Sequence, residues 1–451
     1  CFIFRRRSGG GAGWFLTGGV FGYKCGCVPG SARHNLGMTR KASPLSRRRF
    51  IKTSSAVVTA AATCQIVPRH VVGGPGKVPP SETFGGALIG VGGRGPGTYK
   101  SMCSGLNVRQ LALCDVKFLE RADNKKIYSD FRRVLERKDI DLIAIATPPN
   151  WHALISIAAA EAGKDVLCEK PMTRFIAEGR AVVNAFKRYN RVFQIGTFGR
   201  FGSSHNRGNI NTHKIMRSGL LNPCKAVHIK AGGLKVKQWS GDPGLLPQPV
   251  PKNLDWDFYC GPAPLKPYVR PRTGGTHRGY WDYEGGGLSD MAQHHFDPVQ
   301  WTFGKDDTSP VEIEAHAPPP HPECTGMWGW VELKYADGLT FVMDSREWGE
   351  PYSRKKERVV SLNDLSPSDR KKVEAMPDPT PLLSFAEAVK TRGKPGGHAE
   401  AAHRCAAMLH LANITIRVRR KIKYDPVKEE IIGDLEANRF VNPPTRAPWH
   451  L

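Results

Sequence analysis

One segment of the chain combines carboxylate and imidazole side chains at a spacing that suits proton transfer. Residues 285–297 read GGGLSDMAQHHFD. If the segment is helical from about Leu288, then Asp290, His294 and Asp297 fall on one face, because residues four and seven apart stack along a helix. A carboxylate beside an imidazole fixes its tautomer and raises its basicity, which suits a general base that removes a hydroxyl proton. The alternative is a helix whose polar face meets solvent or caps a neighbour.

A glycine-rich motif after an apolar stretch indicates a phosphate-binding turn. Residues 84–91 read FGGALIGV, which predicts a buried strand, and Gly90-Val91-Gly92-Gly93-Arg94-Gly95 fits the pattern G-x-G-x-x-G. Glycine there permits a tight turn, close approach of the backbone to a pyrophosphate and close packing of the next helix. The N-terminus of that helix supplies unpaired N–H groups to the phosphates.

A carboxylate follows the second predicted strand. Residues 109–114 form that strand, and Asp115 comes 20 residues after Gly95. A carboxylate at this place can accept both ribose hydroxyls of NAD and would repel the additional phosphate of NADP. The alternative role for Asp115 is the N-cap of a helix. NAD is therefore the expected cofactor, ahead of NADP.

Strands and helices continue to alternate after this point. The predicted strands cover residues 141–146, 165–168 and 192–196, and the predicted helices cover residues 151–162 and 174–189. Strands that alternate with helices and lack polar faces imply an α/β fold with a doubly wound parallel sheet of the Rossmann type. Ligands bind such sheets at the carboxyl ends of the strands. Thr147-Pro148-Pro149-Asn150 and Glu169-Lys170-Pro171 both follow strands directly.

The second half of the chain has a different pattern. Separated strands are predicted at 226–231, 330–335 and 339–343, the last two joined as a hairpin around Asp337-Gly338. We expect a C-terminal α+β domain with a large, mainly antiparallel sheet and closing helices at 384–390 and 399–418. Trp256, Tyr280 and Trp281 lie in a Pro-rich stretch, where they either stack on sugar rings or anchor a long loop.

These motifs resemble the Gfo/Idh/MocA family, which includes glucose-fructose oxidoreductase and inositol dehydrogenase. The strongest part of the resemblance is Cys168-Glu169-Lys170-Pro171, which matches the family's E-K-P motif. The glycine motif, Thr147-Pro148-Pro149 with His152, and segment 285–297 also carry it. It extends from about residue 84 to the C-terminus. It implies that Lys170 lies between the nicotinamide ribose and the substrate hydroxyl, with Asp290 and His294 as catalytic partners. Ala292 departs from the family, which usually has glycine there.

The resemblance and the strand ends together define the expected site. The catalytic residues are Lys170, His294 and Asp290. No cysteine and histidine spacing typical of zinc is present, so we expect no metal. The residues expected to bind the cofactor are Gly90, Gly92, Gly93, Arg94, Gly95, Asp115, Thr147, Pro148, Asn150, His152, Glu169 and Lys170.

The N-terminal part has the features of an export signal. Residues 1–37 show no regular period and are interpreted as an upstream extension before Met38. Residues 38–80 then contain Arg47-Arg48-Arg49-Phe50 and the short apolar run 56–62, an order that resembles a twin-arginine signal peptide and linker. The run is shorter than the roughly 20 residues that a membrane span needs, so we expect no stable membrane anchor.

The charge of the chain is concentrated in this leader. The 451 residues carry a formal charge of +25, and residues 1–80 hold 13 Lys and Arg but no Asp or Glu, which leaves +12 for the remainder. The basic clusters that remain lack the interleaved aromatic side chains of nucleic-acid surfaces, so no nucleic-acid partner is expected. A chain of this length and 40% hydrophobic content is neither disordered nor a disulfide-stapled mini-protein.

The combined hypothesis is an exported, NAD-dependent oxidoreductase that oxidises a secondary hydroxyl of a sugar, polyol or related small carbohydrate. Its expected domains are 81–203 for NAD binding and 204–451 for substrate binding and catalysis. We expect a homo-oligomer, and we expect the twin-arginine machinery to export the protein to the periplasm. Because free NAD is not expected outside the cytoplasm, the cofactor would be held tightly and regenerated in place by a second substrate or within one redox-neutral cycle. One alternative is an NAD-dependent glycosidase or lyase without net redox change. The other is a non-catalytic scaffold, against which Lys170, Asp290 and His294 argue jointly.

Overall fold

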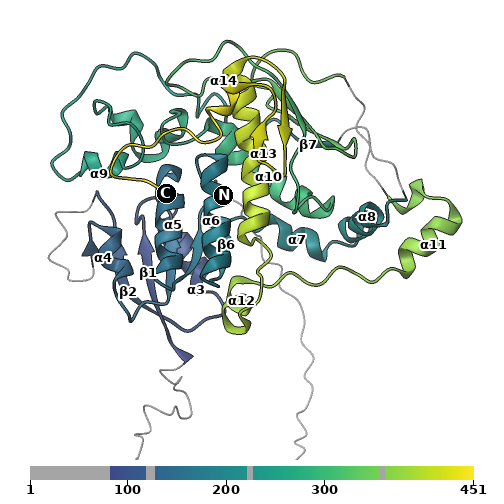
Figure 1. Cartoon of the computed structure of the whole chain (residues 1–451), viewed down its shortest axis with the longest axis horizontal. Coiled ribbons are helices and arrows are strands. Elements are labelled where there is room, and N and C mark those ends of the chain that lie inside the picture. Colours follow the sequence, from purple (N-terminus) through teal and green to yellow (C-terminus); the bar gives the residue numbers. More distant parts are fainter. Residues whose placement is uncertain (1–81, 118–126, 221–226, 355–360) are drawn as a thin grey trace, which may run out of the picture. The chain divides into compact units, whose positions relative to one another are not determined.

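The computed structural model describes residues 82–117, 127–220, 227–354 and 361–451 (Figure 1). The interpretations of Met38 and of the twin-arginine segment fall outside these residues. None of the helices in the described ranges is long and apolar enough to cross a membrane.

The first sheet has six parallel strands in the order β3-β2-β1-β4-β5-β6. The chain order reverses between β1 and β4, which opens a crevice at the carboxyl ends of these strands. The predicted doubly wound parallel sheet is thus confirmed. Its strands are β1 (Phe84–Ile89), β2 (Val108–Cys114), β3 (Ile127–Tyr128), β4 (Leu142–Ile145), β5 (Asp165–Cys168) and β6 (Phe193–Ile195).

Helices cover both faces of this sheet because its strands are apolar on both sides. On one face, Leu142 and Ala144 of β4 share a core with α3 and with α12 (Phe385–Thr391). On the other, Ile143 and Ile145 share a core with α5 and α6. Figure 1 shows α5 and α6 side by side over the strands. The helices of this part are α3 (Gly95–Cys103), α4 (Phe131–Leu135), α5 (His152–Glu161) and α6 (Ile176–Arg188).

The second sheet is mixed but mainly antiparallel, as predicted. Its order is β12-β11-β8-β9-β10-β7, and only the pairing of β7 with β10 is parallel. The predicted hairpin joins β9 to β10, and Gly338 occupies its turn with a φ of 90°. The strands are β7 (Val227–Ala231), β8 (Glu312–His316), β9 (Trp330–Lys334), β10 (Thr340–Asp344), β11 (Ile422–Asp425) and β12 (Glu430–Ile431).

One long helix, α13, connects the two cores. Ala402 and Ala406 near its start pack into the core of the first sheet, whereas Leu409 and Ile416 pack into that of the second. It is buried on nearly every side, and polar residues such as His403, His410 and Asn413 are buried along it together with the apolar ones. The remaining helices are α7 (Gly199–His205), α8 (Arg207–Ser218), α9 (Trp256–Cys260), α10 (Gly286–Thr302), α11 (Pro367–Ala375), α12 (Phe385–Thr391), α13 (Ala399–Val418) and α14 (Leu435–Asn438).

Candidate active site

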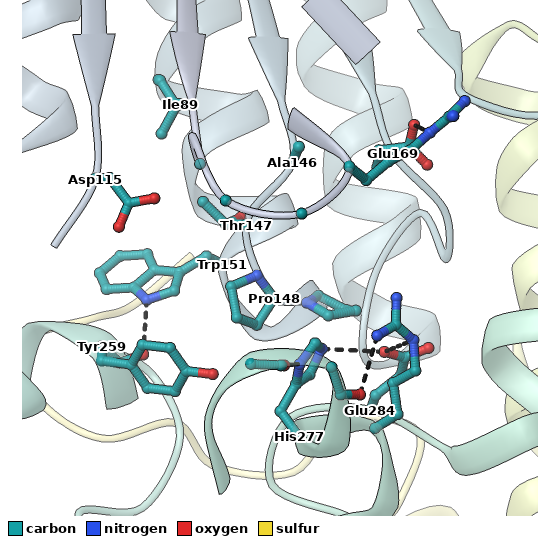
Figure 2. Close-up of a pocket in the computed structure, with 18 of the residues that line it drawn as sticks. Ile89, Asp115, Ala146, Thr147, Pro148, Trp151, Glu169, Tyr259, His277 and Glu284 are labelled. Atoms are coloured by element: carbon teal, nitrogen blue, oxygen red, sulfur yellow. Dashed lines mark hydrogen bonds and ion pairs between the residues drawn. The ribbon is translucent and has the colours of Figure 1, made fainter. Parts of the chain in front are cut away.

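A cavity of about 610 Å³ lies where the carboxyl ends of the first sheet meet loops and helices of the second half. Figure 2 shows residues from both halves around it, including Asp115 and Thr147 on one side and His277 and Glu284 on the other. The expected residues that line it are Gly90, Gly92, Gly93, Arg94, Asp115, Thr147, Pro148, Glu169, Lys170, Asp290 and His294.

The glycine motif forms the turn between β1 and α3. Gly90 has a φ of 90°, and a Cβ there would lie 2.5 Å from the carbonyl carbon of Ala146. A Cβ on Gly95 would lie 2.1 Å from the carbonyl oxygen of Gly90, so the helix starts directly against the strand end. Around Gly92 and Gly93, by contrast, no atom of the described residues lies within 4 Å of the place of a Cβ. The turn is therefore closed on its inner side and open toward the cavity, which suits a pyrophosphate.

Asp115 is held at the end of β2 by backbone groups. Its Oδ2 accepts a hydrogen bond from the N–H of Val91 and its Oδ1 one from the N–H of Lys117, both at 2.8 Å. Each carboxylate oxygen has more than one lone pair, so both can still accept hydroxyl groups from the cavity.

Glu169 connects the glycine turn to the E-K-P segment. Its Oε1 accepts hydrogen bonds from Arg94 Nε at 3.0 Å and from Thr98 Oγ1 at 2.7 Å. The Arg94 side chain is 58% exposed, whereas that of Glu169 is 8% exposed. These bonds fix the residue that immediately precedes Lys170.

Lys170 forms a buried ion pair with Asp290 across 120 positions of the chain. Its Nζ donates to Asp290 Oδ1 at 2.5 Å and to the Asp290 carbonyl oxygen at 2.7 Å, and the two side chains are 10% and 8% exposed. Arg278 Nε lies 2.8 Å from the same Oδ1. Burial alone would raise the pKa of Asp290, but Lys170 and Arg278 together hold it below its ordinary value. The side chain that was expected to orient His294 thus binds Lys170 and Arg278.

His294 faces the cavity one turn after Asp290. Burial, followed by the nearby positive charge of Lys170, lowers the pKa of His294. The imidazole is therefore neutral near pH 7 and can accept a proton. Asp297, the third residue of the predicted face, instead binds Arg200 of α7 at 2.7 Å and is fully buried.

The three glycines before Asp290 let α10 start against close neighbours. A Cβ on Gly285 would lie 2.2 Å from Asn413 Nδ2, and one on Gly287 would lie 2.5 Å from the carbonyl oxygen of Leu234. Gly286 has a φ of 67°, which favours glycine. The glycines therefore allow the backbone approach that brings Asp290 and His294 into the cavity.

Three residues expected to bind the cofactor do not line the cavity: Gly95, which packs against the end of β1, and Asn150 and His152. Asn150 is buried and its Nδ2 donates to the carbonyl oxygen of Cys260 at 2.9 Å. His152 is also buried, and its ring nitrogens are 2.8 Å from the Pro171 carbonyl oxygen and 2.9 Å from that of Thr147. The sequence motif located both residues at the correct strand end. Their side chains, however, position neighbouring backbone segments.

Two segments, 255–262 and 446–449, pack together against Trp151 in the wall of the nucleotide end of the cavity; we call them the clamp. Trp151 Nε1 lies 3.1 Å from the carbonyl oxygens of Phe258 and Tyr259, and Figure 2 shows the contact with Tyr259. The Trp151 ring stacks on Phe258 at a centroid distance of 5.2 Å. Trp449 packs edge-on against Trp151 at 4.8 Å. Arg446 Nε donates to the carbonyl oxygen of Gly261 at 2.8 Å, which ties the two segments together.

Several cavity residues had no clear sequence signal. They come from loops whose Gly, Pro and Trp content predicts no regular element. Trp256, Tyr280 and Trp281 do not line the cavity; they are buried, and each donates to a backbone carbonyl oxygen, so they anchor the loops. Within the described ranges, no group of His, Cys, Asp and Glu could hold a metal ion. The cavity residues that the sequence did not indicate are Lys235, Trp239, Tyr259, His277, Arg278 and Glu284.

Fold and site together are those of a two-domain protein with a dinucleotide-binding turn at the strand ends and a cavity that extends from it to α10. Residues 87–197 match the oxidoreductase family's NAD-binding Rossmann fold, and residues 207–451 match its C-terminal alpha/beta domain. The chain belongs to the Gfo/Idh/MocA oxidoreductase family.

Curated relatives include enzymes that act on carbohydrates. The chain is 34% identical over 177 residues to levoglucosan dehydrogenase of Pseudarthrobacter phenanthrenivorans, covering 39% of this chain and 36% of the relative. It is 30% identical over 173 residues to a glycosyl hydrolase family 109 protein of Shewanella pealeana, covering 32% and 37%. Inositol 2-dehydrogenase of Salmonella paratyphi B is 27% identical over 155 residues, covering 32% and 45%. Each match thus spans less than half of the relative.

A solved structure has the same fold. The WlbA dehydrogenase of Bordetella pertussis, in complex with NADH and UDP-GlcNAcA, superposes with a TM-score of 0.50 at 15% identity. The match covers 76% of this chain and 98% of that protein.

Proposed function

We propose that this protein is an exported NAD-dependent oxidoreductase that oxidises a secondary hydroxyl of a sugar, polyol or related small carbohydrate. The observation that carries the proposal is the Lys170–Asp290 ion pair beside His294, in the same cavity as the glycine turn. The similarity to levoglucosan and inositol dehydrogenases supports the substrate class.

The residues around the nucleotide end fit NAD. The open side of Gly92 and Gly93 would take the pyrophosphate, and Asp115 would accept the ribose hydroxyls. Thr147 Oγ1 is buried, has no hydrogen-bond partner among the described residues and borders the cavity, so a bound ligand could satisfy it. When bound there, NAD would accept the hydride from the substrate carbon.

Lys170 and His294 divide the proton chemistry. Lys170 Nζ has three N–H groups when it is protonated, and two donate to Asp290, which leaves one for the substrate hydroxyl oxygen. The neutral ring nitrogen of His294 accepts the hydroxyl proton as the hydride departs. Asp290 holds Lys170 in position rather than acting on the substrate.

The clamp supports tight retention of the cofactor. Residues 255–262 and 446–449 pack against the wall of the nucleotide end through Trp151, Phe258 and Trp449. This packing would stiffen the wall and slow the release of the nucleotide. A protein that works outside the cytoplasm needs such retention, because it cannot replace a lost nucleotide. The twin-arginine segment would export the folded protein with NAD inside.

Two measurements test this proposal. Mass spectrometry of the nucleotide that is released when the purified protein is denatured should detect NAD or NADH. Detection of NADP would contradict the role of Asp115, and absence of any nucleotide would contradict tight retention.

The second measurement concerns export. A fusion of residues 38–80 to a reporter should reach the periplasm. Substitution of Arg48 and Arg49 by lysine should abolish this export, and export that survives the substitution would refute the twin-arginine assignment.

A redox-neutral glycosidase is the second candidate, because the chain is similar to a glycosyl hydrolase family 109 protein. Such an enzyme would oxidise the sugar transiently and then reduce it again. The discriminating assay follows the absorbance of NADH and product formation together. NADH in equal amount to product supports the oxidoreductase, whereas product without NADH supports the glycosidase.

A further inference from the structure

The substrate end of the cavity contains a cation without a counter-charge. Lys235 lines the cavity, and among the described residues it has neither an ion pair nor a side-chain hydrogen bond. The other charged groups at this end are paired: Asp290 contacts both Lys170 and Arg278, and Glu284 Oε2 lies 3.8 Å from Arg278 Nε. Over the whole lining, five cations face four carboxylates, because Arg94, Lys117, Lys170, Lys235 and Arg278 stand against Asp115, Glu169, Glu284 and Asp290.

The backbone at Lys235 is held in an unusual conformation. Its φ is 56°, in the left-handed region, where glycine or asparagine would be favoured. Glu347 fixes the loop by accepting hydrogen bonds from the N–H groups of Val236 and Lys237 at 3.1 and 2.9 Å. Lys235 thus combines a backbone position that glycine would occupy with less strain and a side chain in the cavity lining.

The same loop lies against the first turn of α10. The place of a Cβ on Gly287 is 2.5 Å from the Leu234 carbonyl oxygen and 3.1 Å from the Val236 Cα. Lys235 is between these two residues, so it enters the cavity about one helical turn before Asp290. Trp239 lines the cavity nearby and can contact the C–H face of a sugar ring.

We propose that the substrate is a sugar acid whose carboxylate binds Lys235. A single carboxylate would balance the extra positive charge, while Trp239 contacts the ring and Lys170 with His294 contacts the reacting hydroxyl. This inference rests on the proposed function and narrows its substrate to uronic or aldonic acids.

The test uses three pairs of compounds that differ in a carboxylate: D-glucuronate and D-glucose, D-galacturonate and D-galactose, D-gluconate and D-glucitol. Calorimetry on the protein with its nucleotide measures the dissociation constant of each. In at least one pair, the acid should bind at least about 10-fold more tightly than its neutral partner, as a charge-assisted hydrogen bond allows.

Matched variants locate the effect. Lys235→Met should weaken binding of that acid about 10-fold to 100-fold and leave the neutral partner unchanged, and Lys235→Arg should retain most of the affinity. Lys237→Met is the control, because Lys237 is exposed two positions away but does not line the cavity. Lys235→Gly should lose the acid preference without losing stability in urea, since glycine suits the backbone.

The outcomes separate this inference from the proposed function. Three results would overturn the sugar-acid proposal: equal affinity for the acid and its neutral partner in all three pairs, no binding of any acid, or acid binding that is unchanged in Lys235→Met. Oxidation of a neutral sugar without acid preference would overturn it while leaving the oxidoreductase assignment intact. Acid binding that depends on Lys235, without any reduction of NAD, would support the site and contradict the proposed function.

Discussion

Asp290→Asn tests whether the buried ion pair organises the site. The substitution keeps the side-chain shape and one acceptor oxygen but removes the negative charge that lies between Lys170 and Arg278. Removal of one partner from a buried ion pair costs about 3 to 5 kcal/mol. The amide oxygen offsets about 1 kcal/mol of this through its hydrogen bond. We therefore expect the free energy of unfolding in urea to fall by about 2 to 4 kcal/mol.

A second ion pair provides the control. Lys305 Nζ lies 2.5 Å from Asp337 Oδ2, the same separation as in the site, but Asp337 is 43% exposed. Solvent screening should limit the cost of Asp337→Asn to about 1 kcal/mol or less. In the variant that combines Lys170→Met with Asp290→Asn, the cost should be smaller than the sum of the single costs, because the unpaired ammonium is gone. Equal costs for Asp290→Asn and Asp337→Asn would refute the reasoning.

Three further predictions concern proton transfer, retention and cofactor choice. Because burial lowers the pKa of His294, kcat/KM for oxidation should be constant above about pH 6.5 and fall at lower pH as His294 becomes protonated. His294→Asn should abolish this fall at low pH and reduce kcat/KM about 10²-fold to 10⁴-fold, and a pH profile that is unchanged in the variant would exclude His294 as the base. Trp449→Ala should accelerate nucleotide release about 3-fold to 10-fold in a stopped-flow displacement assay, because each aromatic contact contributes about 1 kcal/mol. Trp348→Ala, which lies outside the clamp, should leave the release rate unchanged, and equal release rates for the two variants would refute the role of the clamp. Asp115→Ser should raise the affinity for NADP relative to NAD at least about 10-fold by calorimetry, and an unchanged ratio would contradict the role of Asp115.

The sequence predicted the elements of the site better than the contacts between them. The apolar strands and the glycine motif determine local structure through short-range chemistry, so β1 and the glycine turn occur where expected. The contact of Lys170 with Asp290 joins residues 120 positions apart and depends on how two domains pack, which no local spacing reveals.

Segment 285–297 illustrates both outcomes. Helical spacing correctly indicated that Asp290 and His294 lie on the same side of α10. Asp297 has the same angular position, but it lies about 10 Å further along the axis, where α7 covers the helix and Arg200 binds the carboxylate. Arg278 belongs to a short 3-10 helix, Gly274–Gly279, without apolar periodicity, so nothing in the sequence distinguished it.

The most direct measurement follows deuterium from substrate to nucleotide. The purified protein with its nucleotide is mixed with a perdeuterated carbohydrate that it converts, stopped within one turnover, and the released nucleotide is weighed by mass spectrometry. The account predicts reduced NAD that carries one substrate deuterium, and none in Lys170→Ala. Product formed by the wild-type protein without deuterium in the nucleotide would contradict hydride transfer at this site.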